Sequence, residues 1–302
     1  MTHSVLDRVS PYLLLILTTL FWAGNFNLAR AVSTQVPPMS LSYWRWTIAA
    51  LLLLPFVWKH LIATWNIFKK NWLLVSALAL LGVTGFNSLV YLGLQTTTAI
   101  NGVLMQSVCP IFIIILATFL LGERATGLQW LGIITSLLGV VIILVRGDIQ
   151  VLKTLSFTYG DLILLVAVLS WALYTVLLRK LPAALKGLPI LGYTIVLGSM
   201  MILPLYLYET YALNHPMPIT WVSMGSIAYV AIFPSLLAYW FWNYATAKLG
   251  AGRTGQFTHL IPVFGLTIAT LLLGERLYSF HWLGGALVAL GLVLSNWKSK
   301  AA

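Results

Sequence analysis

A block of sequence that occurs twice, half a chain apart, constrains this fold more than any other feature. The first copy runs from Pro110 to Gly132 and the second from Pro262 to Gly284 in the 302-residue chain, and the two align without a gap. Both copies carry Leu-Gly-Glu-Arg followed by Trp-Leu-Gly, and Trp22 upstream matches Trp171. Similarity at a fixed separation indicates internal duplication. A separation of half the chain indicates one duplicated unit rather than a solenoid of short repeats.

The composition assigns both units to a membrane. Hydrophobic residues make up 60% of the chain and charged residues only 8%, whereas soluble domains carry about 25% charged residues. The apolar runs are about 20 residues long, which is the length of a helix that crosses the hydrocarbon core. The short alternating segments of a membrane β-barrel are absent. The single cysteine, Cys109, excludes a disulfide framework and a cysteine-based metal site. We therefore expect an all-α polytopic membrane protein.

The apolar runs predict ten transmembrane helices, five in each copy. The predicted ranges are 11–32, 40–58, 72–94, 99–121, 128–146, 160–180, 188–208, 221–245, 254–273 and 281–297. The units are therefore predicted to be residues 1–147 and 148–302. Because five is an odd number, the second unit must insert upside down relative to the first. Inverted repeats of this kind place substrate sites near the membrane midplane, where the repeats meet.

The positions of lysine and arginine predict the orientation and account for the net charge of +11 without a nucleic-acid partner. If the N-terminus is cytoplasmic, 12 basic residues lie inside and 4 outside. The inner set is Arg8, Lys59, Lys69, Lys70, Arg124, Arg179, Lys180, Lys186, Lys248, Arg253, Lys298 and Lys300, and the outer set is Arg30, Arg146, Lys153 and Arg276. Basic residues concentrate on the cytoplasmic side of membrane proteins. Both termini are therefore predicted to be cytoplasmic.

Together these features resemble the EamA family of the drug/metabolite transporter superfamily. The resemblance rests on the two units, each ending in Pro…Leu-Gly-Glu…Trp-Leu-Gly and a glycine-rich helix, and on the sequences at Phe21–Phe26 and Tyr43–Trp46. It covers nearly the whole chain. The resemblance implies an exporter or permease of the bacterial inner membrane for small metabolites, often amino acids. One departure is that Arg45 has Thr194 near the equivalent position, which confines any role of Arg45 to the first unit.

Acidic residues are scarce, and none is predicted to lie at the centre of a span. The six are Asp7, Glu123, Asp148, Asp161, Glu209 and Glu275. An intramembrane acid is the usual proton or cation site, so this pattern argues against a carboxylate-coupled antiporter of bulky cations. Glu123 and Glu275 lie at equivalent span ends. We interpret them as turn residues that accept backbone N–H bonds at the start of the next helix, and the alternative is a gating or coupling role.

Polar and aromatic side chains gather on spans one, three, four, six, eight and nine, which correspond in pairs under the repeat. This distribution predicts a central cavity shared by the two units. The candidate substrate-binding residues are Trp22, Asn25, Asn87, Gln106, Trp171, Tyr174, Tyr239, Asn243, Gln256 and His259. The alternative for the amides is hydrogen bonding between helices, and for the tryptophans it is packing. For His259, hydrogen-bonded structure is favoured over proton coupling.

Two further features bear on the centre of the membrane. Pro110 and Pro262 lie near the middle of their spans, where each removes a backbone N–H and is expected to kink its helix and shape the cavity. The alternative is a kink with a purely structural role. Arg45 is predicted to extend its charge towards the membrane interface, with binding of a carboxylate as the alternative.

Glycines form a smooth stripe on the last span of each unit. The stripe is made by Gly132 and Gly139 in the first unit and by Gly284 and Gly291 in the second. Such stripes allow close packing of helices, either inside the protein or at a dimer contact. A monomer and a homodimer are both compatible with the sequence.

The sequence therefore predicts a secondary transporter that exports small metabolites, such as amino acids or related amphipathic solutes, by alternating access around a midplane cavity. An importer or a lipid flippase on the same fold is the alternative. An enzyme is not expected, because motifs such as His-Glu-x-x-His and Gly-x-Ser-x-Gly are absent. No cofactor, metal or nucleic acid is expected. The expected partners are a small-molecule substrate and the lipid bilayer.

Overall fold

A computed structural model describes residues 5–97, 99–146, 148, 150–153, 158–273 and 278–297, and these residues form only helices and connecting loops. Nine helical stretches within these ranges are long and apolar enough to cross a membrane. A tenth stretch crosses the bundle in separate pieces. The predicted all-α polytopic fold is therefore confirmed.

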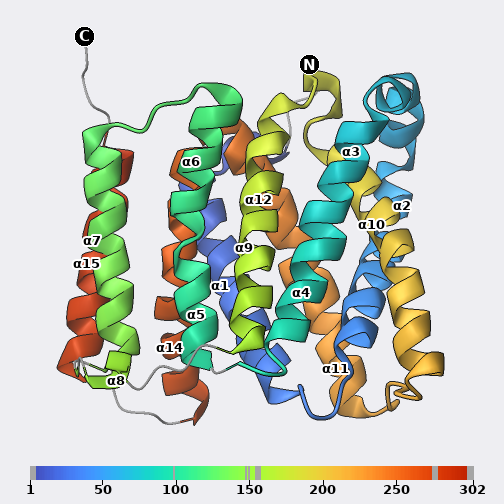
Figure 1. Ribbon diagram of the computed structural model, residues 1–302. Coiled ribbons are helices and arrows are strands. Elements are labelled where there is room, and N and C mark those ends of the chain that lie inside the picture. Colours follow the sequence, from blue (N-terminus) through green and yellow to red (C-terminus); the bar gives the residue numbers. More distant parts are fainter. Residues whose placement is uncertain are drawn as a thin grey trace.

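The first unit contributes five spans of alternating direction (Figure 1). After the 3-10 turn η1 (Val5–Arg8), the spans are α1 (Pro11–Ala31), α2 (Pro38–Lys70), α3–η2–α4 (Trp72–Leu78, Ala79–Gly85, Phe86–Gly93), α5–α6 (Ala99–Ser107, Cys109–Leu121) and α7 (Gly127–Leu144). Helix α2 is longer than its predicted range, because nothing after Trp58 breaks it. Its 33 residues exceed the about 20 that cross a hydrocarbon core of ~30 Å, and its last turns lie across the end of the bundle (Figure 1).

The second unit repeats this order in the opposite direction. A short helix α8 (Gln150–Lys153) precedes α9–η3 (Tyr159–Leu177, Leu178–Lys180), and η4 (Ala183–Leu185) precedes α10–η5 (Leu188–Leu207, Tyr208–Ala212). The last spans are α11–η6–α12 (Trp221–Val230, Ala231–Leu237, Ala238–Leu249), α13–η7–α14 (Ala251–Gly255, Gln256–His259, Leu260–Leu273) and α15 (Ser279–Asn296). Helix α1 starts and α15 ends on the same side of the bundle, here called the N-terminal face, while α1 and α9 run in opposite directions (Figure 1). The two units are thus inverted repeats, as predicted.

The span predicted at 254–273 is interrupted. The 3-10 segment η7 separates α13 from α14, and the 14 residues of α14 extend only about 21 Å. The corresponding span of the first unit is divided at Val108, between α5 and α6. Pro110 is the second residue of α6 and Pro262 the third of α14. In the first turn of a helix a missing N–H breaks no helical bond, so both prolines lie where a new helix begins after each break.

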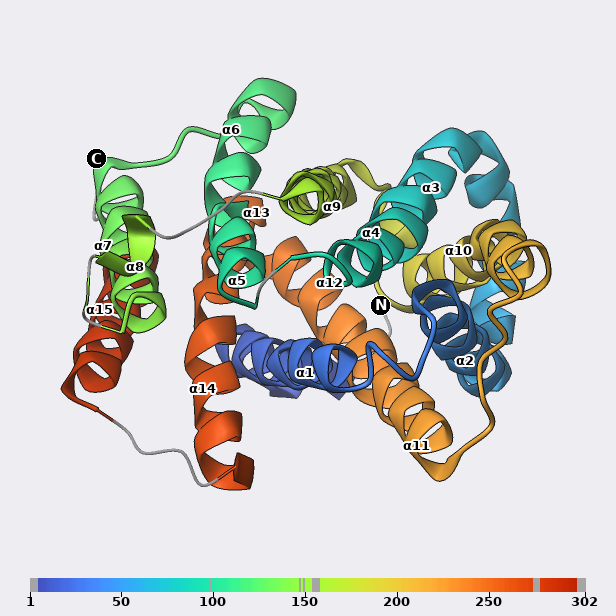
Figure 2. The same ribbon diagram turned by 60° about the horizontal axis from the view of Figure 1, so that its bottom comes forward.

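Packing follows the repeat. Helix α1 packs against α12 and α14, and its counterpart α9 packs against the equivalent helices α4 and α6. The α7–α15 pair forms one end of the bundle and the α2–α10 pair the other, with the remaining spans between them (Figures 1 and 2). The interface between the units therefore runs through the middle of the protein.

The glycine stripes set the spacing of the α7–α15 pair. A Cβ atom added to Gly291 would lie 2.4 Å from the carbonyl oxygen of Gly132, and one added to Gly139 would lie 2.5 Å from the carbonyl oxygen of Gly284. Backbones this close leave no space for a methyl group. The stripes are thus an internal contact between equivalent helices of the two units.

Candidate functional site

The aromatic candidates form one cluster between the units. The ring centroid of Trp171 on α9 lies 5.0 Å from that of Trp22 on α1, 4.9 Å from Tyr174 and 5.2 Å from Tyr239 on α12. Trp242, which was not singled out from the sequence, lies 5.0 Å from Trp22. All five rings are buried. Residues from both units thus form a single aromatic core.

Equivalent π-helices expose backbone carbonyls to this core. The π-helices η2 and η6 occupy matching positions in the third span of each unit, and π-turns recur at functional sites. The carbonyl of Gly82 in η2 accepts a hydrogen bond from the hydroxyl of Tyr239 (2.5 Å), and that of Pro234 in η6 accepts one from Trp22 Nε1 (3.2 Å). Gly82 and Pro234 are equivalent in the repeat, so the two units receive aromatic donors at the same backbone point.

Two hydrogen bonds join residues that occupy equivalent positions in the two units, 152 residues apart. The bonds are Asn87 Nδ2 to Tyr239 OH (2.9 Å) and His259 Nε2 to Ser107 O (2.8 Å). Equivalent residues meet only close to the axis that relates the units. Asn87, Tyr239 and His259 therefore lie on the pseudo-two-fold axis of the bundle.

His259 joins the two interrupted spans. Its Nδ1 lies 2.5 Å from Ser136 Oγ on α7, while Nε2 contacts the carbonyl of Ser107 at the end of α5. At that point Ile111 N–H donates to Val108 O (3.1 Å), one residue beyond the Ser107 carbonyl that a continuous helix would use. Both ring nitrogens of His259 are thus engaged with groups near the α5–α6 break, and the side chain is fully buried.

Two of the amide candidates, Asn243 and Gln256, are buried but incompletely bonded. The hydroxyl of Tyr174 donates to Asn243 Oδ1 (2.7 Å), but Asn243 Nδ2 has no partner among the described residues. Neither amide atom of Gln256 has one there. Buried polar atoms normally find hydrogen-bond partners. These side chains can therefore accept a solute or water without breaking a protein bond.

Arg45 lies inside the protein, so the predicted snorkelling is wrong. Its side chain is 0% exposed. It turns inward because its face of α2 packs against η6 and α4, where Ser235, Asn87 and Tyr91 provide hydrogen-bond acceptors. Tyr91 in turn donates to the candidate Asn25 (2.9 Å). An arginine inside an apolar span is itself a functional signal, and it was the signal available in the sequence.

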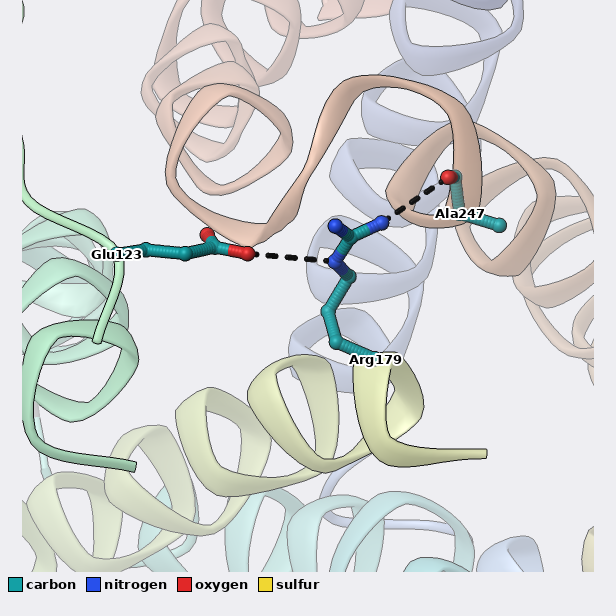
Figure 3. Close-up of polar contacts among 3 residues, drawn as sticks. All are labelled: Glu123, Arg179 and Ala247. Atoms are coloured by element: carbon teal, nitrogen blue, oxygen red, sulfur yellow. Dashed lines mark hydrogen bonds and ion pairs between the residues drawn. The ribbon is translucent and has the colours of Figure 1, made fainter. Parts of the chain in front are cut away.

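Glu123 forms an ion pair between the units, and the capping role predicted for Glu123 belongs instead to Thr126. Thr126 Oγ1 accepts from the N–H of Gln129 (3.2 Å) at the start of α7. Gly122, at φ 70°, ends α6 in the left-handed conformation that glycine favours. Glu123 Oε1 then lies 3.4 Å from Arg179 Nε, and Arg179 Nη1 donates to the carbonyl of Ala247 on α12 (3.1 Å; Figure 3). Its counterpart Glu275 lies outside the described residues.

The same ion pair lines a cavity of about 400 Å³ at the N-terminal face. The charged residues around this cavity, here called the vestibule, are Glu123, Arg124, Arg179, Lys248 and Arg253. Lys248 is paired with Asp7 (3.1 Å), whereas Arg124 and Arg253 have no ionic partner in the described part of the chain. The vestibule is therefore positively charged. None of the ten candidate binding residues lines it, so the central cluster is closed off from it.

Comparison with known proteins identifies the chain. Residues 9–145 and residues 158–297 each match the sequence model of a family described as "EamA-like transporter family". The chain belongs to the EamA-like transporter family. Its members form part of the drug/metabolite transporter superfamily and are transporters, not enzymes. The protein is thus a multi-pass membrane transporter, which implies a small-molecule substrate.

Relatives share the full length of the chain. The "Uncharacterized transporter YyaM" of Bacillus subtilis (strain 168) is 34% identical over 298 residues, which cover 96% of this chain and 95% of the relative. A protein of Streptantibioticus cattleyicolor named "Probable terminal-alkyne amino-acid exporter" is 26% identical over 286 residues, covering 93% and 92% of the two chains. A solved crystal structure has the same fold, with a TM-score of 0.72, 18% identity and coverage of 95% and 96%.

Proposed function

We propose that the protein exports small amphipathic metabolites, such as amino acids or related solutes, across the bacterial inner membrane. The observation that supports this most is the core near the pseudo-two-fold axis, where aromatic rings from both units meet the incompletely bonded amide of Asn243. Rocking of inverted repeats about such a core gives alternating access. The relative named as an amino-acid exporter supports the direction and the class of solute. We also propose units of residues 1–147 and 148–302 and cytoplasmic termini.

A growth challenge tests this function. Cells that overexpress the protein and cells with an empty vector would be exposed to toxic levels of single amino acids, toxic analogues and common drugs. Selective resistance to one class is expected and would identify the exported class. Sensitisation would instead indicate import. If none of these compounds changes growth while the protein is detected in the membrane, the result would contradict metabolite export and favour a lipid substrate.

Candidate residues of the core are expected to be needed for transport. Asn25→Ala, Gln106→Ala and Trp22→Ala should each lower the resistance conferred, because each removes a polar or aromatic contact for the solute. The loss of one hydrogen bond of about 1–2 kcal/mol corresponds to a roughly 5–30-fold lower rate. Asn27→Ala is the matched control, since Asn27 lies two residues from Asn25 on α1 but is exposed. Wild-type activity in all three variants, at equal membrane abundance, would contradict the site.

A further inference from the structure

Arg45 is a buried cation whose protein partners are all neutral. It lies about 10 Å along α2 from Pro38 and is fully shielded. Its Nε donates to Ser235 Oγ (2.7 Å), and its Nη1 donates to Asn87 Oδ1 (2.9 Å) and to the hydroxyl of Tyr91. No carboxylate pairs with it within the described ranges. Because arginine keeps its proton in proteins, the site carries an uncompensated positive charge.

The guanidinium also has free donors. Arginine offers five N–H groups, and the three bonds above use one on Nε and two on Nη1. The remaining two are both on Nη2, which is buried and has no hydrogen-bond partner among the described residues. Two N–H groups on one nitrogen can bind the oxygens of an acidic group with charge-assisted hydrogen bonds.

The buried acids of the described structure are engaged elsewhere. Glu209 accepts hydrogen bonds from the N–H groups of Met39 (3.0 Å) and Ser40 (2.7 Å) at the start of α2. Asp161 accepts one from Asn101 (2.9 Å) at the start of α9. A charge in a low-dielectric core without a counter-ion is costly. Since no described side chain supplies the negative charge, a bound anion is the natural counter-ion.

Aromatic surface extends from the guanidinium into the core. Arg45 Cζ lies 4.9 Å from the ring centroid of Trp46. The Trp46 ring lies 4.9 Å from Tyr239, and Tyr239 lies 5.2 Å from Trp171. A solute whose acidic end meets Arg45 would therefore place its apolar end against aromatic rings, which suit flat and apolar groups.

Charge and access on the two faces fit an anionic solute that comes from the N-terminal face. The vestibule on that face carries an excess of positive charge, and such an excess concentrates ions of the opposite sign. On the other face, Tyr91, the residue bonded to Arg45, lines a cavity of only about 10 Å³. A space of this size holds about one water molecule, so the exit towards that face is closed here.

We propose that Arg45 binds the acidic group of the transported solute, and that this solute is a small organic carboxylate with an apolar or aromatic body. The inference rests on the transport function proposed above and specifies its substrate class. Arg45 supplies the two Nη2 donors, and Trp46 and Tyr239 begin the apolar wall. A cation or an uncharged solute would leave the guanidinium unpaired.

Thermal shift of the purified full-length protein in detergent tests the proposal. The carboxylate probes are phenylacetate and L-phenylalanine, and the matched probes without a carboxylate are phenethylamine and L-phenylalaninamide. Phenyl phosphate distinguishes a phosphate site. We expect the carboxylates alone to raise the melting temperature, by roughly 5 °C at concentrations well above Kd. Arg45→Gln should abolish the shift and Arg45→Lys should weaken it. Lys59→Gln, which removes an exposed charge from the same helix, should retain it.

The melting temperatures of the variants without ligand distinguish a loss of binding from a loss of structure. Arg45→Gln should melt at or above the wild-type temperature, because it removes an uncompensated charge and leaves its neighbours other partners, such as Val230 O for Ser235. Four results would overturn the anion site: equal shifts with carboxylates and amides, a shift with phenyl phosphate alone, a full shift retained in Arg45→Gln, or no shift with any anion. The export proposal would survive these results if the growth challenge still gave resistance to an uncharged or cationic compound. It fails if that challenge is blank or if it gives sensitisation.

Discussion

Gly291→Ala is expected to destabilise the protein, whereas Gly285→Ala on the same helix is expected to be neutral or stabilising. A Cβ atom on Gly291 would lie 2.4 Å from Gly132 O and 2.6 Å from Ser136 N, both of which are backbone atoms of α7. At Gly285 nothing lies within 4 Å of the added atom. Overpacking of a close contact costs about 1–3 kcal/mol, while alanine favours a helix over glycine by about 0.5–1 kcal/mol.

Cys109 provides the measurement. It is the only cysteine in the chain, and its side chain is fully buried in the folded protein. A thiol-reactive fluorophore therefore reports unfolding in a heating scan. The Gly291→Ala midpoint should fall by about 5 °C, taking roughly 2–4 °C per kcal/mol, and the Gly285→Ala midpoint should stay level or rise. Equal midpoints for the two variants would show that α7 and α15 do not pack through the glycine stripe.

The sequence was sufficient for the architecture because its signals are long and repeated. Apolar runs define the spans by length, and the duplicated Leu-Gly-Glu-Arg…Trp-Leu-Gly block divides them into two groups of five. An odd number per unit then requires inversion, which depends on counting and not on side-chain detail. The glycine stripes predicted close packing for the same reason. Whether they met inside one chain depended on which helices become neighbours, which only the three-dimensional structure shows.

Local sequence patterns gave wrong or incomplete predictions for side chains whose position depends on contacts with other spans. Arg45 lies between Trp44 and Trp46 near the start of α2, a pattern typical of a snorkelling side chain. It is buried because acceptors on two other spans, Asn87 and Ser235, face it, and no window of sequence around α2 contains them. Glu123 likewise looked like a turn residue, yet its partner is Arg179 in the other unit.

The sequence predicted which residues lie at the candidate site better than it predicted how they are arranged. Pairing of polar spans under the repeat selected Asn87, Tyr239 and His259, and the structure places all three on the pseudo-two-fold axis. The π-helices η2 and η6 and the break at η7 were not predicted, because they depend on hydrogen bonds made in the packed bundle. These irregular segments expose the carbonyls of Gly82 and Pro234 to the core. At the centre of the interface, regular α-helix is therefore interrupted by π-helical and 3-10 segments.

The Glu123–Arg179 ion pair joins the first unit to the second at the N-terminal face, and we propose that it helps to close this face during transport. The pair connects the end of α6 with η3, and Arg179 extends the connection to α12 through Ala247. Both side chains are about one-third exposed, at 38% and 31%. An exposed pair contributes only about 0–1 kcal/mol to stability. Its loss should therefore alter the balance between open and closed states more than it alters folding.

Glu123→Arg is accordingly expected to reduce transport strongly while leaving the melting temperature within a few degrees of wild type. The variant places like charges at the contact and shifts the closed state by roughly 1–2 kcal/mol, a factor of about 5–30. The combined exchange Glu123→Arg with Arg179→Glu should restore most of the activity, because it re-forms the pair with opposite polarity. Lys180→Glu is the matched control, since Lys180 is adjacent to Arg179 and exposed but does not line the vestibule. Resistance in the growth challenge reports transport. Full activity of Glu123→Arg, or failure of the exchange while both proteins remain folded, would show that the pair has no part in closing the N-terminal face.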